Sequence, residues 1–187
     1  LGELLAAAKR GVRVRLLLDD VGTSGLDAPL AALDGHPQIE VRLFNPFTLR
    51  RPKVLGYLGD LRRANRRMHN KSFTADNQAS IVGGRNVGDE YFGATTGVLF
   101  ADLDVLAVGP AVQDVSADFD RYWASASAYP AQAILPAVEP AAMAQLEEQA
   151  RTLLASPAAH DYAQSILRSD YMRQLLAHEL PLEWARV

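Results

Sequence analysis

Two strand patterns separated by a helical pattern constrain the fold more than any other feature of the sequence. The segment VRVRLLLDD (12–20) changes from alternating to continuously apolar residues, which is typical of a strand covered on both faces. Helical spacing then relates Leu26, Leu30 and Leu33, and IEVRLF (39–44) is a second strand pattern. Because a strand, helix, strand unit builds a parallel sheet, we expect an α/β fold with flanking helices.

The middle of the chain adds a hairpin to this unit. MHNKSFTA (68–75) and ASIVGG (79–84) predict two short strands joined at the turn DNQ, and LDVLAVG (103–109) predicts a further strand. A helix is expected after Pro110. Residues 45–67 have no sustained period and predict a long loop, which inside a compact domain is often functional. The expected sheet is therefore mixed.

The final part of the chain is rich in alanine and predicts helices over residues 141–156 and 159–180. We expect one domain over residues 1–130, followed by a helical connection over residues 131–187. The chain opens on a helical pattern without Met and closes on the strand-like LPLEWARV, so we expect it to be part of a longer polypeptide.

Composition excludes several classes of protein and site. Of the 187 residues, 49% are apolar, as in globular domains, and no apolar run approaches the roughly 20 residues of a membrane span. The chain has no cysteine, which excludes disulfides and thiolate zinc sites. The glycine-rich phosphate loops GxGxxG and GxxxxGK[ST] are also missing, and no cofactor is expected.

Basic residues are concentrated immediately before the hairpin. The net charge is −3, yet residues 50–71 hold eight of the 19 Lys and Arg residues and a single acid, Asp60. Such a cluster suits an anionic partner, either a lipid headgroup or a nucleic acid. The alternative is a solvated loop that keeps the protein soluble.

The segment MHNKSFTADNQASIVGGRN (68–86) carries the candidate chemistry. Because alternate side chains of a strand share a face, His69 and Lys71 are expected side by side, roughly 7 Å apart. A neutral imidazole is a competent nucleophile at about pH 7, and an adjacent ammonium stabilises negative charge on the attacked group. This pair is suited to attack on phosphorus.

Residues after the second strand of the hairpin could bind a phosphate. Gly83 and Gly84 allow a ligand to approach their backbone N–H groups closely, and Asn86 offers an amide donor. Asp76 has the opposite parity from the histidine and lies at the turn, so we expect it to secure the hairpin or the surroundings of the lysine. Each of these features alone has an ordinary structural explanation.

The combined pattern His69-x-Lys71-x4-Asp76-x6-Gly83-Gly84-x-Asn86 resembles the HKD motif of the phospholipase D superfamily. The segments GVRVRLLLDD, IEVRLFNPF and DLDVLAVGP are similar to the bacterial cardiolipin synthase branch. The resemblance covers about residues 1–130. It implies a phospholipase D-like mixed sheet flanked by helices, with a helical C-terminal extension.

The resemblance also implies roles for individual residues, in a metal-independent phosphatidyl transfer through a phosphohistidine on His69. The implied catalytic residues are His69, Lys71, Asp76 and Asp102. The implied phosphate-binding residues are Lys71, Gly84 and Asn86. Asp102 aligns best with the family acid that orients the nucleophilic histidine, and Asp104, on the same strand face, is the alternative.

Family members combine two HKD motifs, and one histidine attacks while the other protonates the leaving alcohol. This chain has one motif, since His36, His160 and His178 are not followed by x-Lys and are interpreted as structural or surface residues. We expect the second half further along the same full-length chain or on a homodimer mate. The chain alone is then expected to be inactive.

The leading hypothesis is a cardiolipin synthase-like phosphatidyltransferase with anionic phospholipid substrates and phosphatidylglycerol as acceptor. It would be peripheral on the cytoplasmic side of the bacterial inner membrane, with the basic loop (50–67) facing the lipid. A phosphodiesterase or nuclease is the second hypothesis, but Tyr57 is the one aromatic residue between 50 and 71, which argues against nucleic acid as the partner. An inactive binding half is the third hypothesis.

Overall fold

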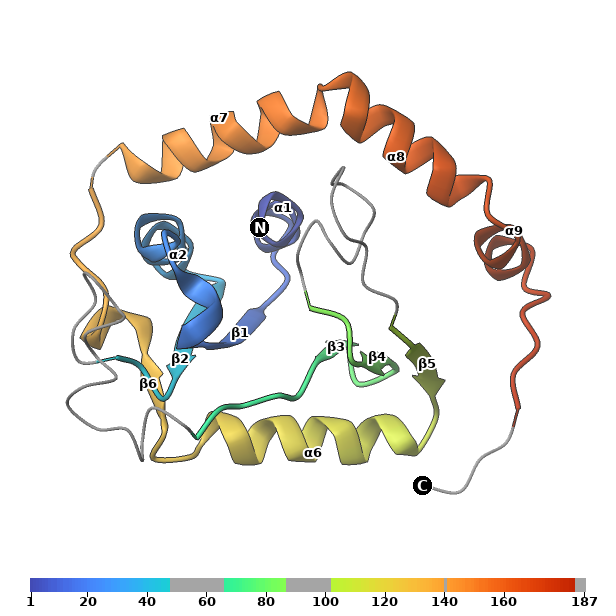
Figure 1. The fold of residues 1–187 in the computed structure, drawn as a ribbon, viewed down its shortest axis with the longest axis horizontal. Helices are drawn as coiled ribbons and strands as arrows, with labels where there is room; N and C mark the ends of the chain where they lie inside the picture. Colours follow the sequence, from blue (N-terminus) through green and yellow to red (C-terminus); the bar gives the residue numbers. More distant parts are fainter. Residues whose placement is uncertain (48–65, 87–101, 140, 184–187) are drawn as a thin grey trace. The chain divides into compact units, whose positions relative to one another are not determined.

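The computed structural model of the protein describes residues 1–47, 66–86, 102–139 and 141–183 (Figure 1). The chain forms two compact units that interleave along the sequence. The helical unit comprises residues 1–15, 26–40 and 135–187, and the sheet unit comprises residues 16–25 and 41–134. The expected domain boundary at residue 130 stays a prediction.

Three helices form the packed part of the helical unit. They are α1 (Gly2–Lys9), α2 (Asp27–Asp34) and α7 (Ala142–Leu154), and α7 packs against the other two. Leu146 is the buried residue of α7. Gly2 allows α1 to approach α7 closely, because a Cβ at Gly2 would lie 2.7 Å from the Cβ of Ala150.

Two further helices, α8 (Pro157–Leu167) and α9 (Asp170–Leu176), follow α7 and contain no buried residue. The single helix expected over residues 159–180 is wrong. The Oγ of Ser169 accepts a hydrogen bond from the Met172 backbone N–H at 3.3 Å, so this serine caps a new helix.

The first sheet contains β1 (Val14–Asp19), β2 (Ile39–Phe44) and β6 (Ala128–Pro130), in the order β1-β2-β6. The first two residues of β1 and of β2 belong to the helical unit, and the rest of this sheet belongs to the sheet unit. Along β2, Ile39, Val41 and Leu43 are buried and the alternate residues are not. β1 lies at the edge of this described sheet and is half-buried, and not fully covered as expected. The strands expected at 12–20 and 39–44 are both present.

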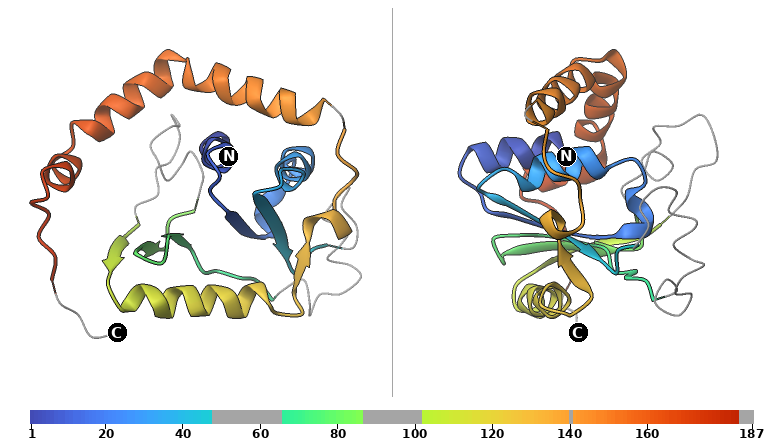
Figure 2. Two further views of the ribbon diagram at one scale, coloured as in Figure 1. Left: turned by 180° about the vertical axis from the view of Figure 1, so that it is seen from behind. Right: turned by 90° about the vertical axis from the view of Figure 1, so that its left-hand side faces the viewer.

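The second sheet is antiparallel and has the order β3-β4-β5. Its strands are β3 (Ser72–Ala75), β4 (Ala79–Gly83) and β5 (Asp104–Val108). Helix α6 (Ala111–Trp123) contacts all three strands and runs along one face of this sheet (Figure 1 and Figure 2). The small sheets with their flanking helices confirm the expected α/β class.

Leu146→Ala should lower the free energy of unfolding of the protein by about 3 kcal/mol, because the substitution leaves a cavity where α7 packs on α1 and α2. Urea denaturation measures this change. Leu153→Ala is the matched control on the same helix, since Leu153 is 67% exposed. Equal losses for the two variants would contradict the packing of α7.

Candidate active site

His69 and Lys71 lie immediately before β3 and not within it, since the strand begins at Ser72. His69 is exposed and Lys71 is half-buried. The Nζ of Lys71 donates a hydrogen bond to the backbone oxygen of His69 at 2.9 Å. The expected strand over residues 68–75 is therefore too long at its beginning.

The antiparallel order of the second sheet brings three segments to one of its ends. β3 begins there, β4 ends there and β5 begins there, as the pairs Ser72↔Val82 and Gly83↔Asp104 require. The Gly83 backbone N–H continues the ladder by donating to the oxygen of Lys71 at 3.3 Å. The segments that carry the predicted residues, 69–71, 83–86 and 102–104, thus meet at this end.

Gly83 and Gly84 allow the start of β5 to approach β4. A Cβ at Gly83 would lie 2.6 Å from the oxygen of Leu103, and one at Gly84 would lie 2.7 Å from the Cγ of Asp102. The N–H of Gly84 donates to the oxygen of Leu103 at 3.4 Å. The expectation that both amides face a ligand is therefore not met, because each is used inside the sheet.

The two candidate acids differ in their partners. Asp104 is half-buried and its Oδ2 accepts from the Nε of Arg85 at 2.6 Å, whereas Asp102 is exposed. Arg85 also donates through Nη2 to the backbone oxygen of Asp102 at 3.2 Å. In the described part of the chain the imidazole of His69 makes no hydrogen bond, so the choice of Asp102 as its orienting acid stays a prediction.

Asp76 lies at the opposite end of the hairpin from His69. Asp76 and Asn77 have φ angles of +52° and +53°, and the Gln78 N–H donates to the oxygen of Ala75 at 3.0 Å, which makes this a type I′ turn. The turn is fastened to α6, because Ser116 Oγ donates to Asn77 Oδ1 at 2.7 Å. The structure does not bring Asp76 together with the other predicted residues.

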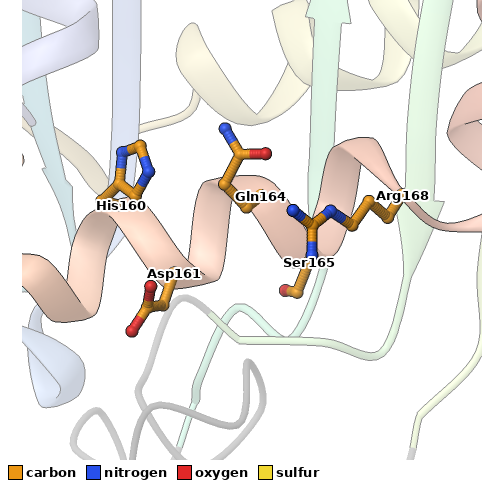
Figure 3. Close-up of a pocket in the computed structure, with 5 residues that line it drawn as sticks. All are labelled: His160, Asp161, Gln164, Ser165 and Arg168. Carbon is orange, nitrogen blue, oxygen red and sulfur yellow. The ribbon is translucent and has the colours of Figure 1, made fainter.

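Asn86 is exposed and lies two residues beyond Gly84, at the end of the sheet that carries the histidine. A separate hollow contains none of the predicted site residues. It is lined by His160, Asp161, Gln164 and Ser165 of α8 and by Arg168, the residue after that helix (Figure 3). Within residues that the structure describes, no group of three His, Asp or Glu side chains is placed to hold a metal ion. None of the described helices is both long and apolar enough to cross a bilayer.

Side chains at the ends of β1 and β2 hold the chain just before the candidate nucleophile. Asp19 accepts from Arg67 Nη1 at 3.1 Å through Oδ1 and from the Met68 N–H at 2.8 Å through Oδ2. Asn45 donates through Nδ2 to the backbone oxygen of Arg66 at 2.7 Å. The backbone oxygen of Asn45 accepts from Arg67 Nη1 at 3.2 Å. We refer to Asp19, Asn45 and Arg67 as the strand-end clamp.

The sequence alone assigned Arg67 to the basic cluster that suits an anionic partner. The structure corrects this assignment, because the side chain of Arg67 is 20% exposed and forms an ion pair with Asp19. The remaining basic residues from Arg50 to Arg63 lie outside the described residues. The signal that could have found the clamp is a polar residue at the end of each strand pattern, Asp19 in LLLDD and Asn45 in LFNPF.

The family model for the cardiolipin synthase, phospholipase D-like domain matches residues 1–123. The chain belongs to this family. Within the family it is 53% identical over 183 residues to cardiolipin synthase C of Escherichia coli (strain K12), a match that covers 98% of this chain and 38% of that protein. The predicted relationship to the cardiolipin synthase branch is thereby confirmed.

Other relatives match about two thirds of the chain's length. Cardiolipin synthase 2 of Staphylococcus aureus (strain COL) is 34% identical over 130 residues, covering 67% of this chain and 24% of that protein. An uncharacterized protein of Helicobacter pylori (strain ATCC 700392 / 26695) is 47% identical over 124 residues, covering 65% and 24%. The chain therefore spans well under half the length of each of these three relatives.

Gly83→Ala should lower the free energy of unfolding by about 1–3 kcal/mol, because the new Cβ would overlap the backbone at the start of β5. Gly22→Ala is the matched control, since a Cβ at Gly22 has no neighbour within 4 Å. Urea denaturation of both variants measures the difference. Equal stability of the two variants would show that β5 does not approach β4 as described.

Proposed function

We propose that the full-length protein is a phosphatidyltransferase of the cardiolipin synthase type, which moves a phosphatidyl group to phosphatidylglycerol without a metal. The observation that carries the proposal is the meeting of the His69, Gly84 and Asp102 segments at one end of a sheet. Membership of the cardiolipin synthase family and 53% identity to cardiolipin synthase C support the choice of reaction. They do not favour the nuclease or the inactive half.

In the first half-reaction a ring nitrogen of His69 attacks the phosphorus of the donor lipid. An N–P bond forms, the P–O bond to the leaving alcohol breaks, and that alcohol takes a proton from a general acid. In the second half-reaction the hydroxyl of phosphatidylglycerol attacks the phosphohistidine and gives its proton to the same group, which is now a base. An O–P bond forms and the N–P bond to His69 breaks. The reaction exchanges one phosphodiester for another, so it needs no redox partner.

Lys71 and Asn86 would stabilise the negative charge that develops on the nonbridging oxygens. An ammonium and an amide aimed at these oxygens act most strongly where water is excluded. Asp102 would orient the histidine through a hydrogen bond formed when substrate is bound, since catalytic hydrogen bonds often tighten only in the complex. Gly84 would contribute through its place beside the Asp102 carboxylate.

The general acid must come from outside this chain's single HKD motif. We propose a second histidine from another part of the full-length polypeptide or from a second copy of it. The relatives are long enough for the first arrangement, since this chain covers 38% of cardiolipin synthase C. Phospholipid substrates fit a peripheral position at a membrane surface, and we propose the cytoplasmic side of a bacterial inner membrane.

His69→Ala in the full-length enzyme should lower kcat by at least about 10³-fold, because the covalent step loses its nucleophile. Cardiolipin formation from phosphatidylglycerol vesicles measures activity, and mass spectrometry of the acid-sensitive phosphoramidate on His69 detects the intermediate. His160→Ala, on the exposed surface of α8, is the matched control and should keep full activity. Transfer by His69→Ala at the wild-type rate would reject this function.

Lys71→Met should lower kcat by about 10²-fold, because the transition state loses one cationic partner while the nucleophile remains. Steady-state kinetics on mixed vesicles measure this change. Lys9→Met is the matched control, since Lys9 pairs with Glu147 at 2.9 Å within the helical unit. A Lys71 variant that changes KM alone would assign the lysine to binding of the ground state.

A further inference from the structure

We propose that the strand-end clamp, Asp19, Asn45 and Arg67, positions the backbone of His69 for attack, and that these three are positioning residues of the enzyme. The inference rests on the proposed function, because it assigns the clamp to the same histidine. It goes beyond the HKD pattern, which contains none of the three residues.

The clamp fixes the chain on the N-terminal side of His69 by both side chain and backbone. The Asp19 carboxylate binds the Arg67 guanidinium and the Met68 N–H, which belongs to the residue next to the histidine. Asn45 binds the oxygen of Arg66 through its side chain. Three consecutive residues are thus held before the nucleophile.

The contacts of the clamp are largely shielded from water. The side chains of Asp19 and Arg67 are 15% and 20% exposed, and the Cζ of Arg67 lies 4.5 Å from the ring centroid of Phe47. Asn45 is 5% exposed and its φ is +50°, an unusual conformation for a residue other than glycine. Charge-assisted hydrogen bonds in such surroundings have a defined geometry.

The C-terminal side of His69 has its own attachments. The oxygen of Lys71 accepts from the Gly83 N–H at 3.3 Å, and the Nδ2 of Asn70 donates to Asp118 of α6 at 3.4 Å. His69 therefore lies between two fixed points, although it belongs to no helix or strand. Without the clamp, the histidine would be attached to the sheet on one side alone.

A partly buried ion pair adds little net stability compared with apolar residues of the same volume, so stability alone does not account for the clamp. What the pair provides is a specified position for the Met68 backbone. A misplacement of about 1 Å in a reacting group can lower a rate about 100-fold. The clamp therefore acts on the reaction through the place of the histidine.

The test uses the full-length enzyme with Arg67→Met, Arg67→Lys and the control Arg42→Met. Arg42 is also a partly buried arginine of the sheet unit, with Cζ 4.5 Å from the ring centroid of Trp123. We expect Arg67→Met to lower kcat about 100-fold at nearly unchanged KM. Arg67→Lys keeps a cation for Asp19, so its kcat should be at least about tenfold higher than that of Arg67→Met. Arg42→Met should keep the wild-type kcat.

Wild-type kcat in Arg67→Met, in an enzyme that His69→Ala inactivates, would overturn the clamp and leave the proposed function intact. Activity in His69→Ala would instead overturn the function. If Arg67→Met does not fold, Asp19→Asn replaces it, since asparagine keeps an acceptor for the Met68 N–H and loses the charge that pairs with Arg67. If Arg42→Met lost as much kcat as Arg67→Met, both losses would reflect a general loss of stability, and the inference would be rejected.

Discussion

The carboxylate of Asp19 joins two parts of the sheet unit that are far apart in the sequence. It ends β1, accepts the Val21 N–H of the 3₁₀ helix η1 (Asp20–Thr23) at 3.0 Å, and binds Arg67 and Met68. Because this carboxylate accepts hydrogen bonds from both segments, it fixes the distance between residues 19–21 and residues 67–68. The path of residues 66–68 into the candidate active site depends on this carboxylate, because the β3–β4 ladder begins only at Ser72.

The sheet itself supplies the second constraint. Three antiparallel strands place the start of β3, the end of β4 and the start of β5 side by side, and paired glycines let the last of these approach closely. Side chains separated by more than 30 positions, such as Lys71 and Asp104, come to one end as a result. The glycines therefore act on the site by shaping the backbone around it.

Local patterns predicted the strands β1 to β5, the hairpin turn and α6 because period and turn chemistry are properties of neighbouring residues. The three-residue strand β6 was not predicted. The sequence also indicated the family through the spacing of His69, Lys71 and Asn86. It did not predict that the segment before Ser72 leaves the strand conformation, since the partner of that backbone is a side chain nearly 50 positions earlier. Arg67 was misassigned for the same reason: an arginine in a basic run carries no local sign of burial.

The type I′ turn at Asp76 and Asn77 lies across four residue pairs of the β3–β4 ladder from the histidine end. Its positive φ angles favour Asn and Gly, and its attachment to α6 is independent of the clamp. Substitutions at Asp76 or Asn77 can therefore change the stability of the hairpin without changing the backbone near His69. Substitutions in this turn, natural or engineered, would therefore change the stability of the hairpin at the end opposite to the histidine.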